Sequence, residues 1–269
     1  MSGIANKGAE LDAVLSHIGA VAVAVSGGVD SMTLAVAAGR RLGGRAEMIH
    51  AVSPAVPPEA TARVEAHAQR EGWRLAIIDA GEFADPDYLA NPANRCFFCK
   101  TNLYGTMAAR TRATIVSGTN LDDLGDWRPG LKAAEEHGVR HPYVEAGIDK
   151  ATVRALARRL RLHDLAELPA APCLSSRLAT GIAVTADRLR LVHTVERLIS
   201  RELAPRTVRC RLFHDGVAIQ LDPDGLSRIS GREAATLRRT IEQMVGGSAV
   251  RYEPYRMGSA FLRTGADGA

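Results

Sequence analysis

The feature that most constrains the fold is the stretch AVAVAVSGGVDS at residues 20–31. Its first six residues alternate between alanine and valine, and such a continuous apolar run predicts a strand buried on both faces. The run ends in SGGVDS (26–31), with two glycines, an aspartate and two serines, and SMTLAVAAGRRL (31–42) then predicts a helix. A buried strand that passes through a bare glycine turn into a helix is typical of α/β proteins that bind a phosphate group at the turn.

Predicted strands and helices alternate from residue 20 to about 161. After the first strand we expect strands at 46–53, 73–80, 113–120 and 139–146. Helices are expected at 8–18, 31–42 and 57–72, and at 149–162 with Asp149 as its N-cap. Between the third and fourth strands we expect a loop-rich region that contains NPANRCFFCK (91–100), followed by a helix that ends at about residue 110. This alternation predicts an α/β fold with a doubly wound, mostly parallel sheet. Ligands of such sheets bind outside the carboxyl ends of the strands, where polar loops follow residues 25, 52 and 118.

The pattern changes after residue 163. Residues 164–184 have no sustained period and predict a long functional loop. A helix (185–203), a hairpin (207–216 with 217–223), a helix (230–245) and a strand near 248–253 follow. We therefore expect a nucleotide-binding domain at 1–163, a cysteine-bearing active-site loop at 164–184, and a small α+β domain at 185–269 for substrate binding or oligomerisation.

Composition narrows the class of protein. The 269 residues are 46% hydrophobic, which is enough for a core, and only 4% aromatic, which argues against base-stacking surfaces for nucleic acid. The net charge of +4 suits an anionic ligand. The sequence contains neither a membrane-spanning apolar run nor a signal peptide, so we expect a cytoplasmic protein. Its four cysteines then favour metal, cluster or catalytic roles over disulfides.

The turn SGGVDS has the residues that an anion site needs. Glycines let backbone N–H groups approach a phosphate, and Ser26 and Ser31 add hydroxyl donors. Asp30 would repel a phosphate unless Mg²⁺ bridges the two. The alternative is an ordinary tight turn in which Asp30 or Ser31 caps the helix. The complete pattern favours nucleotide binding, although it matches neither the P-loop nor the dinucleotide-binding motif.

Three cysteines lie in polar loops or beside them. Cys96 and Cys99, in NRCFFCK, can bind zinc, hold an iron–sulfur cluster, act as a redox dithiol, or simply pack. Cys173, in AAPCLSSRLATG, lies close to Arg177, whose charge favours the thiolate as nucleophile or ligand. Cys210 falls inside a predicted strand, and we interpret it as structural.

An acidic loop, SGTNLDDLGDWRPG at 117–130, follows a predicted strand. Its carboxylates, Asp122, Asp123 and Asp126, either hold Mg²⁺ and orient the substrate or belong to a solvated loop with helix caps. Because this loop and the glycine turn lie at the same predicted sheet edge, we favour a functional role.

The turn resembles the PP-loop of the ATP pyrophosphatase superfamily, whose fold is adenine nucleotide alpha hydrolase-like. The whole chain resembles the LarE-type sulfur transferases of nickel-pincer nucleotide biosynthesis, in the landmarks SGGVDS, NRCFFCKTNLY, SGTNLDDLGDWRPG, GVRHPYVEAGIDKATVRALARRL, PAAPCLSSRLATG, VRCRLFHDG and YRMGS. The resemblance implies that ATP adenylates a carboxylate of a pyridinium bis-carboxylate mononucleotide, with release of pyrophosphate. Sulfur then replaces the activated oxygen and gives a thiocarboxylate.

The resemblance also implies roles for individual residues. Those expected to act in catalysis are Cys173, Asp30, Ser176 and Arg177. Those expected to bind ATP are Ser26, Gly27, Gly28, Asp30, Ser31, Ser53, Gly118 and Asp123, with Mg²⁺ at Asp30 and Asp126. Those expected to bind the substrate are Arg209, Arg211, Glu196 and Arg256, with Glu196 otherwise a surface charge. The closing RYEPYRMGS departs from the family pattern at Arg251 and Pro254, which weakens a metal or phosphate role there.

The family contains two routes to sulfur. In one, the cysteine matching Cys173 donates its own sulfur and becomes dehydroalanine; in the other, cysteines matching Cys96, Cys99 and Cys173 hold a 4Fe-4S cluster whose open iron binds hydrosulfide. Because all three cysteines are present, we favour the cluster. The alternatives are an ammonia-using synthetase, a tRNA thiolase and a nucleotide-binding module without turnover. We expect a homo-oligomer that binds a small nucleotide and neither nucleic acid nor membrane.

Overall fold

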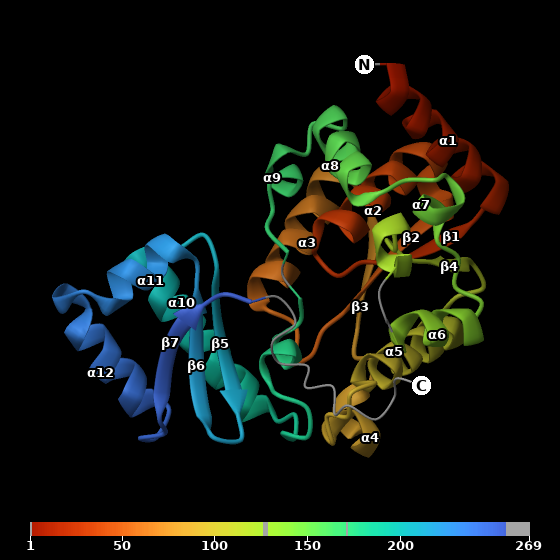
Figure 1. Ribbon diagram of the computed structural model, residues 1–269. Coiled ribbons are helices and arrows are strands. Elements are labelled where there is room, and N and C mark those ends of the chain that lie inside the picture. Colours follow the sequence, from red (N-terminus) through yellow and green to blue (C-terminus); the bar gives the residue numbers. More distant parts are fainter. Residues whose placement is uncertain (1, 126–128, 171, 257–269) are drawn as a thin grey trace. The chain divides into compact units, whose positions relative to one another are not determined.

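The computed structural model describes residues 2–125, 129–170 and 172–256. The chain divides into two compact units (Figure 1). Unit 1 contains Met1–Glu82 and Cys96–Ala171, and unit 2 contains Phe83–Arg95 and Pro172–Ala269. The early segment 83–95 thus belongs to the same unit as the C-terminal part of the chain.

Unit 1 is built on a parallel sheet of four strands in the order β3-β2-β1-β4. The strands are β1 (Val21–Ala24), β2 (Ala46–Ala51), β3 (Arg74–Ile78) and β4 (Thr114–Val116). Val21 pairs with Ala46 on one side and with Thr114 on the other, so the first strand is central. The prediction of an α/β fold with a parallel sheet is confirmed.

Helices cover both faces of this sheet (Figure 1). The helices of unit 1 are α1 (Ser2–Ile18), α2 (Val29–Leu42), α3 (Pro58–Glu71), α5 (Arg95–Arg110), α6 (Pro129–Glu136), α7 (Pro142–Glu145), α8 (Lys150–Arg159) and α9 (His163–Ala166), with short 3-10 turns at η1 (Gly43–Arg45) and η3 (Leu121–Gly125). The 3-10 turn η2 (Glu82–Ala84) lies at the boundary where the chain passes from unit 1 into unit 2. Val21 and Val23 belong to the core formed with α1, α2 and α8, whereas Ala22 and Ala24 belong to the core formed with α5. Because alternate side chains of a strand point to opposite faces, the alanine–valine run serves both cores.

The prediction of a fifth strand at 139–146 is wrong. The backbone of Arg140 bonds to Ile115 and Ser117 beside β4, but this contact is an isolated bridge. Pro142 then occupies the first turn of the short helix α7. Proline lacks an N–H group for a strand ladder, and its fixed φ angle suits the start of a helix.

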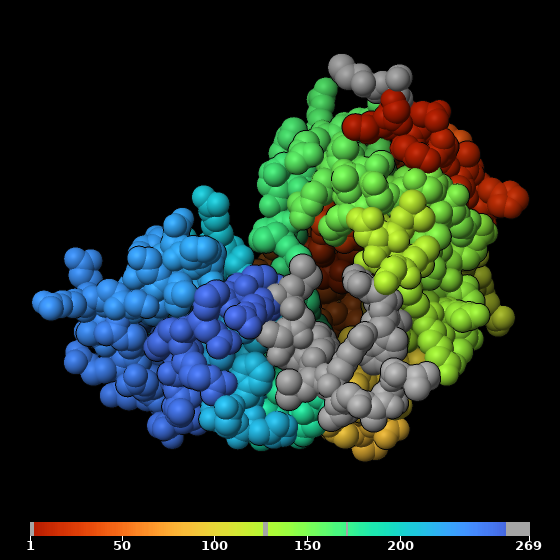
Figure 2. Space-filling model, in the orientation of Figure 1, coloured from red at the N-terminus to blue at the C-terminus, as the bar shows by residue number. Residues whose placement is uncertain are grey.

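Unit 2 contains a mixed sheet of three strands in the order β5-β6-β7. The hairpin of β5 (Val208–Phe213) and β6 (Gly216–Leu221) is antiparallel, as the sequence predicts, and β7 (Val250–Pro254) is parallel to β6. Strand β7, in the darker blue of Figure 2, reaches the surface. The helical elements are α4 (Pro86–Leu89), η4 (Leu174–Arg177), α10 (Ala186–Leu203), α11 (Pro223–Ser230), η5 (Arg232–Ala234) and α12 (Ala235–Met244). Among the described residues, no helix is long and apolar enough to cross a membrane.

The segment 83–95 is fixed to the rest of unit 2 by buried polar contacts. The hydroxyl groups of Tyr88 and Ser175 are 2.7 Å apart. The side-chain amide of Asn91 donates to the carbonyl oxygens of Ala179 and Ile182, at 2.8 Å each. Of these partners, Ser175 and Ala179 follow Cys173 in the sequence by two and six positions. The sequence pattern of this region predicts only a loop and does not show this association, because the partners of Asn91 are about ninety residues away.

Asp149 is the N-cap of α8, as predicted, and its side chain accepts a 2.7 Å hydrogen bond from the backbone N–H of Thr152. Hydrogen bonds from Thr152 hold the pKa of the Asp149 carboxyl below its ordinary value. We expect Asp149→Ala to lower the free energy of unfolding in urea by about 1 kcal/mol at neutral pH.

Because the folded-state pKa of Asp149 is lowered, this contribution is complete above the unfolded pKa and is lost as the pH falls through the folded pKa. Asp149→Asn keeps the acceptor but cannot titrate, so it should retain most of the stability and lose this part of its pH dependence. An unchanged urea midpoint in Asp149→Ala would show that the cap contributes nothing.

Candidate active site

The glycine turn joins β1 to α2 in a conformation that depends on glycine. Gly27 has φ +80°, and a Cβ atom there would lie 2.8 Å from the carbonyl oxygen of Ala60. The hydroxyl of Ser31 accepts a 3.0 Å hydrogen bond from the backbone N–H of Ser26 and lies 3.0 Å from the Ser26 hydroxyl. In the described part of the chain no side chain caps α2 at Gly28, so its first backbone N–H groups suit an anion.

The loop after β4 packs directly against this helix terminus. A Cβ atom on Gly118 would lie 2.7 Å from the backbone nitrogen of Ser31 and 2.9 Å from the carbonyl carbon of Asp30. The hydroxyl of Tyr143 donates to the carbonyl oxygen of Asp30 at 3.1 Å. The structure therefore brings Gly118 together with the predicted residues of the turn.

Asp30 has a cationic partner that the sequence analysis missed. Its carboxylate forms an ion pair with Lys150, the first residue of α8, and accepts a 3.3 Å hydrogen bond from the side-chain amide of Asn120. Lys150 offsets the negative charge that makes Asp30 unfavourable beside a phosphate. The sequence alone shows Lys150 only as a lysine in the first turn of the helix predicted at 149–162.

His50 on β2 bonds to the backbone just before the glycine turn, and the sequence analysis did not identify it. Its side chain is buried, with Nδ1 2.8 Å from the carbonyl oxygen of Val25 and Nε2 3.0 Å from the hydroxyl of Thr61. Burial lowers the pKa of His50, so the ring is neutral near pH 7. A carbonyl can only accept, so Nδ1 carries the proton and Nε2 accepts from Thr61.

The other predicted nucleotide-site residues make local contacts. Ser53 follows β2, and its hydroxyl accepts from the backbone N–H of Ala55 at 3.3 Å. Asp123 accepts from the backbone N–H of Asn120 at 3.1 Å, and Asp122 from that of Lys150 at 3.2 Å. These contacts order the acidic loop beside the turn. Asp126 lies outside the described residues.

The predicted sulfur-site cysteines belong to different units. Cys96 and Cys99 are half-buried in the first two turns of α5 in unit 1, and Cys173 is exposed in unit 2. All four cysteines are thiols, and in the described part of the chain no group of three His, Cys, Asp or Glu side chains is arranged to hold a metal ion. Three thiols are nevertheless a suitable donor set for an iron–sulfur cluster. Cys210 is buried, which raises the pKa of its thiol and agrees with a structural role.

A buried polar network surrounds the backbone of Cys173 in unit 2. Arg177 forms a bidentate ion pair with Glu196, with both N···O distances 2.9 Å. Glu196 is therefore an interior residue and not a surface charge. Arg211 donates to the carbonyl oxygen of Ser176 at 2.9 Å and to the side chain of Gln220 at 2.6 Å.

The arginines expected to bind the substrate lie on or beside the sheet of unit 2: Arg209 and Arg211 are on β5, and Arg256 follows β7. Burial and the charge of Arg177 lower the pKa of both Arg209 and Arg211, although both remain cationic at neutral pH. The guanidinium of Arg209 lies 5.8 Å from the centre of the Tyr255 ring. Arg256 is exposed, and its carbonyl oxygen accepts from Arg211 at 3.5 Å. Such a concentration of positive charge favours an anionic ligand.

The side chain of Arg251 pairs with that of Asp215 at 2.8 Å on the surface of unit 2. Arg251 therefore has a local counter-ion.

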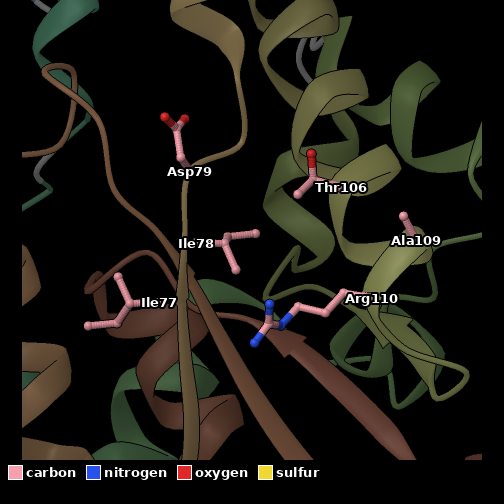
Figure 3. A pocket seen from close by; sticks show the side chains of 6 residues that line it. All are labelled: Ile77, Ile78, Asp79, Thr106, Ala109 and Arg110. Carbon is pink, nitrogen blue, oxygen red and sulfur yellow. The ribbon is translucent and has the colours of Figure 1, made fainter.

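A shallow depression of about 500 Å³ lies elsewhere on unit 1, between β3 and α5 (Figure 3). Its lining residues are Ile77, Ile78, Asp79, Thr106, Ala109 and Arg110, none of which belongs to the predicted site. Ile77 and Ile78 point to opposite sides of the strand, as neighbouring strand residues do (Figure 3). We assign this depression no catalytic role.

Comparisons with known proteins agree with the sequence landmarks, although no family model matches the chain. The chain is 39% identical over 210 residues to an uncharacterized protein of Synechocystis, covering 77% of this chain and 78% of the relative. It is 31% identical over 227 residues to the pyridinium-3,5-bisthiocarboxylic acid mononucleotide synthase of Lactiplantibacillus plantarum, covering 82% and 81%. An uncharacterized protein of Methanocaldococcus jannaschii is 22% identical over 240 residues, covering 88% and 90%.

Proposed function

Since the chain belongs to the family of the pyridinium-3,5-bisthiocarboxylic acid mononucleotide synthase, the LarE-type sulfur transferases, we propose that it is an ATP-dependent sulfur transferase. ATP adenylates a carboxylate of a pyridinium bis-carboxylate mononucleotide, and sulfur then replaces the activated oxygen. The observation that best supports adenylation is the glycine turn, which leads into the N-terminus of α2, where no described side chain caps the helix at Gly28.

In the first step a carboxylate oxygen attacks the α-phosphorus of ATP, and the bond to the β-phosphate breaks. The products are an acyl adenylate and pyrophosphate. Backbone N–H groups of the turn and of α2 bind the phosphates, and Lys150 contributes positive charge beside them. Mg²⁺ commonly binds through one or two carboxylates and the substrate phosphates, and the single carboxylate of Asp30 fits that pattern. The bound ion would neutralise charge on the phosphates.

In the second step a sulfur nucleophile attacks the acyl carbon and AMP leaves. AMP is a far better leaving group than the oxide of a free carboxylate. If hydrosulfide is the donor, the products are the thiocarboxylate, AMP and a proton. A 4Fe-4S cluster held by Cys96, Cys99 and Cys173 would supply the sulfur from an open iron site. This cluster is proposed because these three cysteines occur together and their thiols suit it.

If Cys173 itself is the donor, its thiolate forms a thioester and releases AMP. Loss of the Cys173 α-proton and cleavage of its Cβ–S bond then release the thiocarboxylate and leave dehydroalanine.

Anaerobic reconstitution, with iron and sulfide analysis, distinguishes the routes. Bound iron with an unchanged protein mass after turnover supports the cluster, whereas loss of the mass of H₂S from Cys173 establishes the sacrificial route.

The test of the proposal as a whole is a reaction with ATP, Mg²⁺, a sulfur source and the pyridinium bis-carboxylate mononucleotide. We expect release of pyrophosphate that depends on the carboxylate, and formation of AMP and a thiocarboxylate identified by mass. Release of ADP, or formation of an amide from ammonium in place of a thiocarboxylate, would contradict the proposal.

Lys150 provides a separate test of the nucleotide site. We expect Lys150→Met to raise the KM for ATP about tenfold or more, because the phosphates lose a charged donor and Asp30 loses its ion-pair partner. Pyrophosphate release as a function of ATP concentration measures the effect. Arg158→Met, on the same helix but in an exposed pair with Glu167, is the matched control. An unchanged KM in a folded Lys150→Met protein would exclude Lys150 from the site.

A further inference from the structure

The hydrogen-bonding capacity of Arg177 is almost entirely used inside unit 2. Its side chain is 4% exposed. Nε and one terminal nitrogen donate to the two carboxylate oxygens of Glu196. The other terminal nitrogen lies 2.7 Å from the carbonyl oxygen of Pro172 and 3.1 Å from both the carbonyl oxygen of Cys173 and the hydroxyl of Ser176. At least four of the five N–H groups of the guanidinium therefore have acceptors among the described residues.

Glu196 anchors this guanidinium to the rest of the unit. Its side chain is 10% exposed, and the oxygen that accepts from Nε of Arg177 also accepts a 2.9 Å hydrogen bond from the backbone N–H of Cys210. Cys210 lies in the middle of β5, paired with Ile219 of β6. The carboxylate thus connects helix α10 and the sheet to the turn that contains Cys173.

The backbone of Cys173 is held while its side chain is exposed. The carbonyl oxygen of Cys173 accepts from Arg177 and from the backbone N–H of Ser176, at 3.1 Å and 3.0 Å. The next residues are fixed as well, Ser175 by the buried hydroxyl of Tyr88 and Ser176 by Arg211. The exposed thiol therefore projects from a backbone that is fixed from several elements.

A phosphate or carboxylate of the substrate does not fit well on Arg177. To bind it with a bidentate fork, Arg177 would have to release Glu196, which would leave a buried carboxylate unpaired beside a second anion. Arg177 is therefore held by Glu196 and is unsuited to bind an anionic ligand.

We propose that Arg177 and Glu196 are positioning residues that fix the Cys173 turn through the carbonyl groups of Pro172 and Cys173, and that they do not clamp the substrate. The effect of this positioning on catalysis rests on the proposed sulfur transfer. The fixed backbone of the Cys173 turn is independent of the proposed function. Placement matters because a misplacement of about 1 Å can slow a reaction about a hundredfold. The same fixed turn serves Cys173 as a sulfur donor and as a cluster ligand.

The first experiment is independent of any activity. Hydrogen exchange of peptides covering residues 172–178, followed by mass spectrometry, reports the turn in the full chain. We expect Arg177→Lys, which keeps the charge but loses the fork, to accelerate exchange at the Ser176 amide tenfold or more. Asp187→Asn is the matched control, because Asp187 is on the same helix as Glu196 but its pair with Arg190 is exposed. Unchanged exchange in Arg177→Lys overturns the proposal.

The second experiment separates positioning from substrate binding. A positioning role predicts that Arg177→Lys lowers kcat for thiocarboxylate formation tenfold or more, with KM for the mononucleotide and the rate of pyrophosphate release within twofold of the wild type. A rise in KM for the mononucleotide with an unchanged kcat would identify Arg177 as a substrate clamp and overturn the proposal. If the wild type forms no thiocarboxylate, the proposed function fails, but the exchange experiment still decides the positioning role.

Removing one member of a buried ion pair can unfold a protein, so a paired variant completes the test. Arg177→Met combined with Glu196→Gln leaves no unpaired charge and is expected to fold. It should show the same fast exchange at 172–178 and the same selective loss of kcat as Arg177→Lys. Wild-type exchange and kcat in this folded double variant would also overturn the proposal.

Discussion

Cys173→Ala is expected to lower thiocarboxylate formation at least about a thousandfold, because it removes the sulfur ligand or donor of the second step. Release of pyrophosphate should remain within about twofold of the wild-type rate, since the proposed adenylation residues lie in unit 1 and Cys173 lies in unit 2. The two rates are measured in the same reaction, as pyrophosphate and as thiocarboxylate mass. Their ratio then reports sulfur transfer without interference from the amount of active protein.

Cys210→Ala is the matched control for that variant. Its thiol is buried in β5, so the change leaves a small cavity and should keep sulfur transfer. Cys96→Ala and Cys99→Ala then separate the two sulfur routes. With a cluster, both variants lose iron and thiocarboxylate formation together with Cys173→Ala; with a sacrificial cysteine, both retain a single turnover. Wild-type sulfur transfer in Cys173→Ala would contradict both routes.

The parts of the fold that the sequence predicts correctly are those with a local physical cause. The alanine–valine run is buried on both faces, the glycine turn follows it, and Asp149 caps its helix through a residue three positions away. The hairpin of β5 and β6 also depends on neighbouring residues. The failed strand at 139–146 has an equally local cause, since Pro142 favours a helix start.

The missed parts of the candidate site depend on contacts between distant residues. Lys150 meets Asp30 across 120 residues, and Asn91 meets Ala179 across 88. Glu196 has the spacing of an ordinary helix charge, and only the fold shows that it faces Arg177. Periodicity can place a side chain on a face of its own helix, but it cannot identify the side chain that comes to lie opposite.

Gly118→Ala is expected to lower ATP-dependent pyrophosphate release about tenfold or more, since forcing one extra carbon into a packed site costs about 1–3 kcal/mol. The added Cβ would lie 2.7 Å from the backbone nitrogen of Ser31 and 2.9 Å from the carbonyl carbon of Asp30. Both are backbone atoms of the first turn of α2, so the strain cannot be relieved by moving the end of a flexible side chain. The turn itself has to move, and the N–H groups proposed to bind phosphate move with it.

The matched control is Gly125→Ala in the same loop, where an added Cβ would meet no described atom within 4 Å and where φ is not positive. Gly125→Ala should keep the wild-type KM for ATP and the wild-type rate of pyrophosphate release. Gly118→Ala should show the loss mainly in KM for ATP, since the displaced groups bind its phosphates. A stably folded Gly118→Ala protein with normal ATP kinetics would show that the N-terminus of α2 is not where ATP is held. In that case Asp30 and Lys150 would be a structural ion pair, and the nucleotide site would have to be sought elsewhere on the sheet edge.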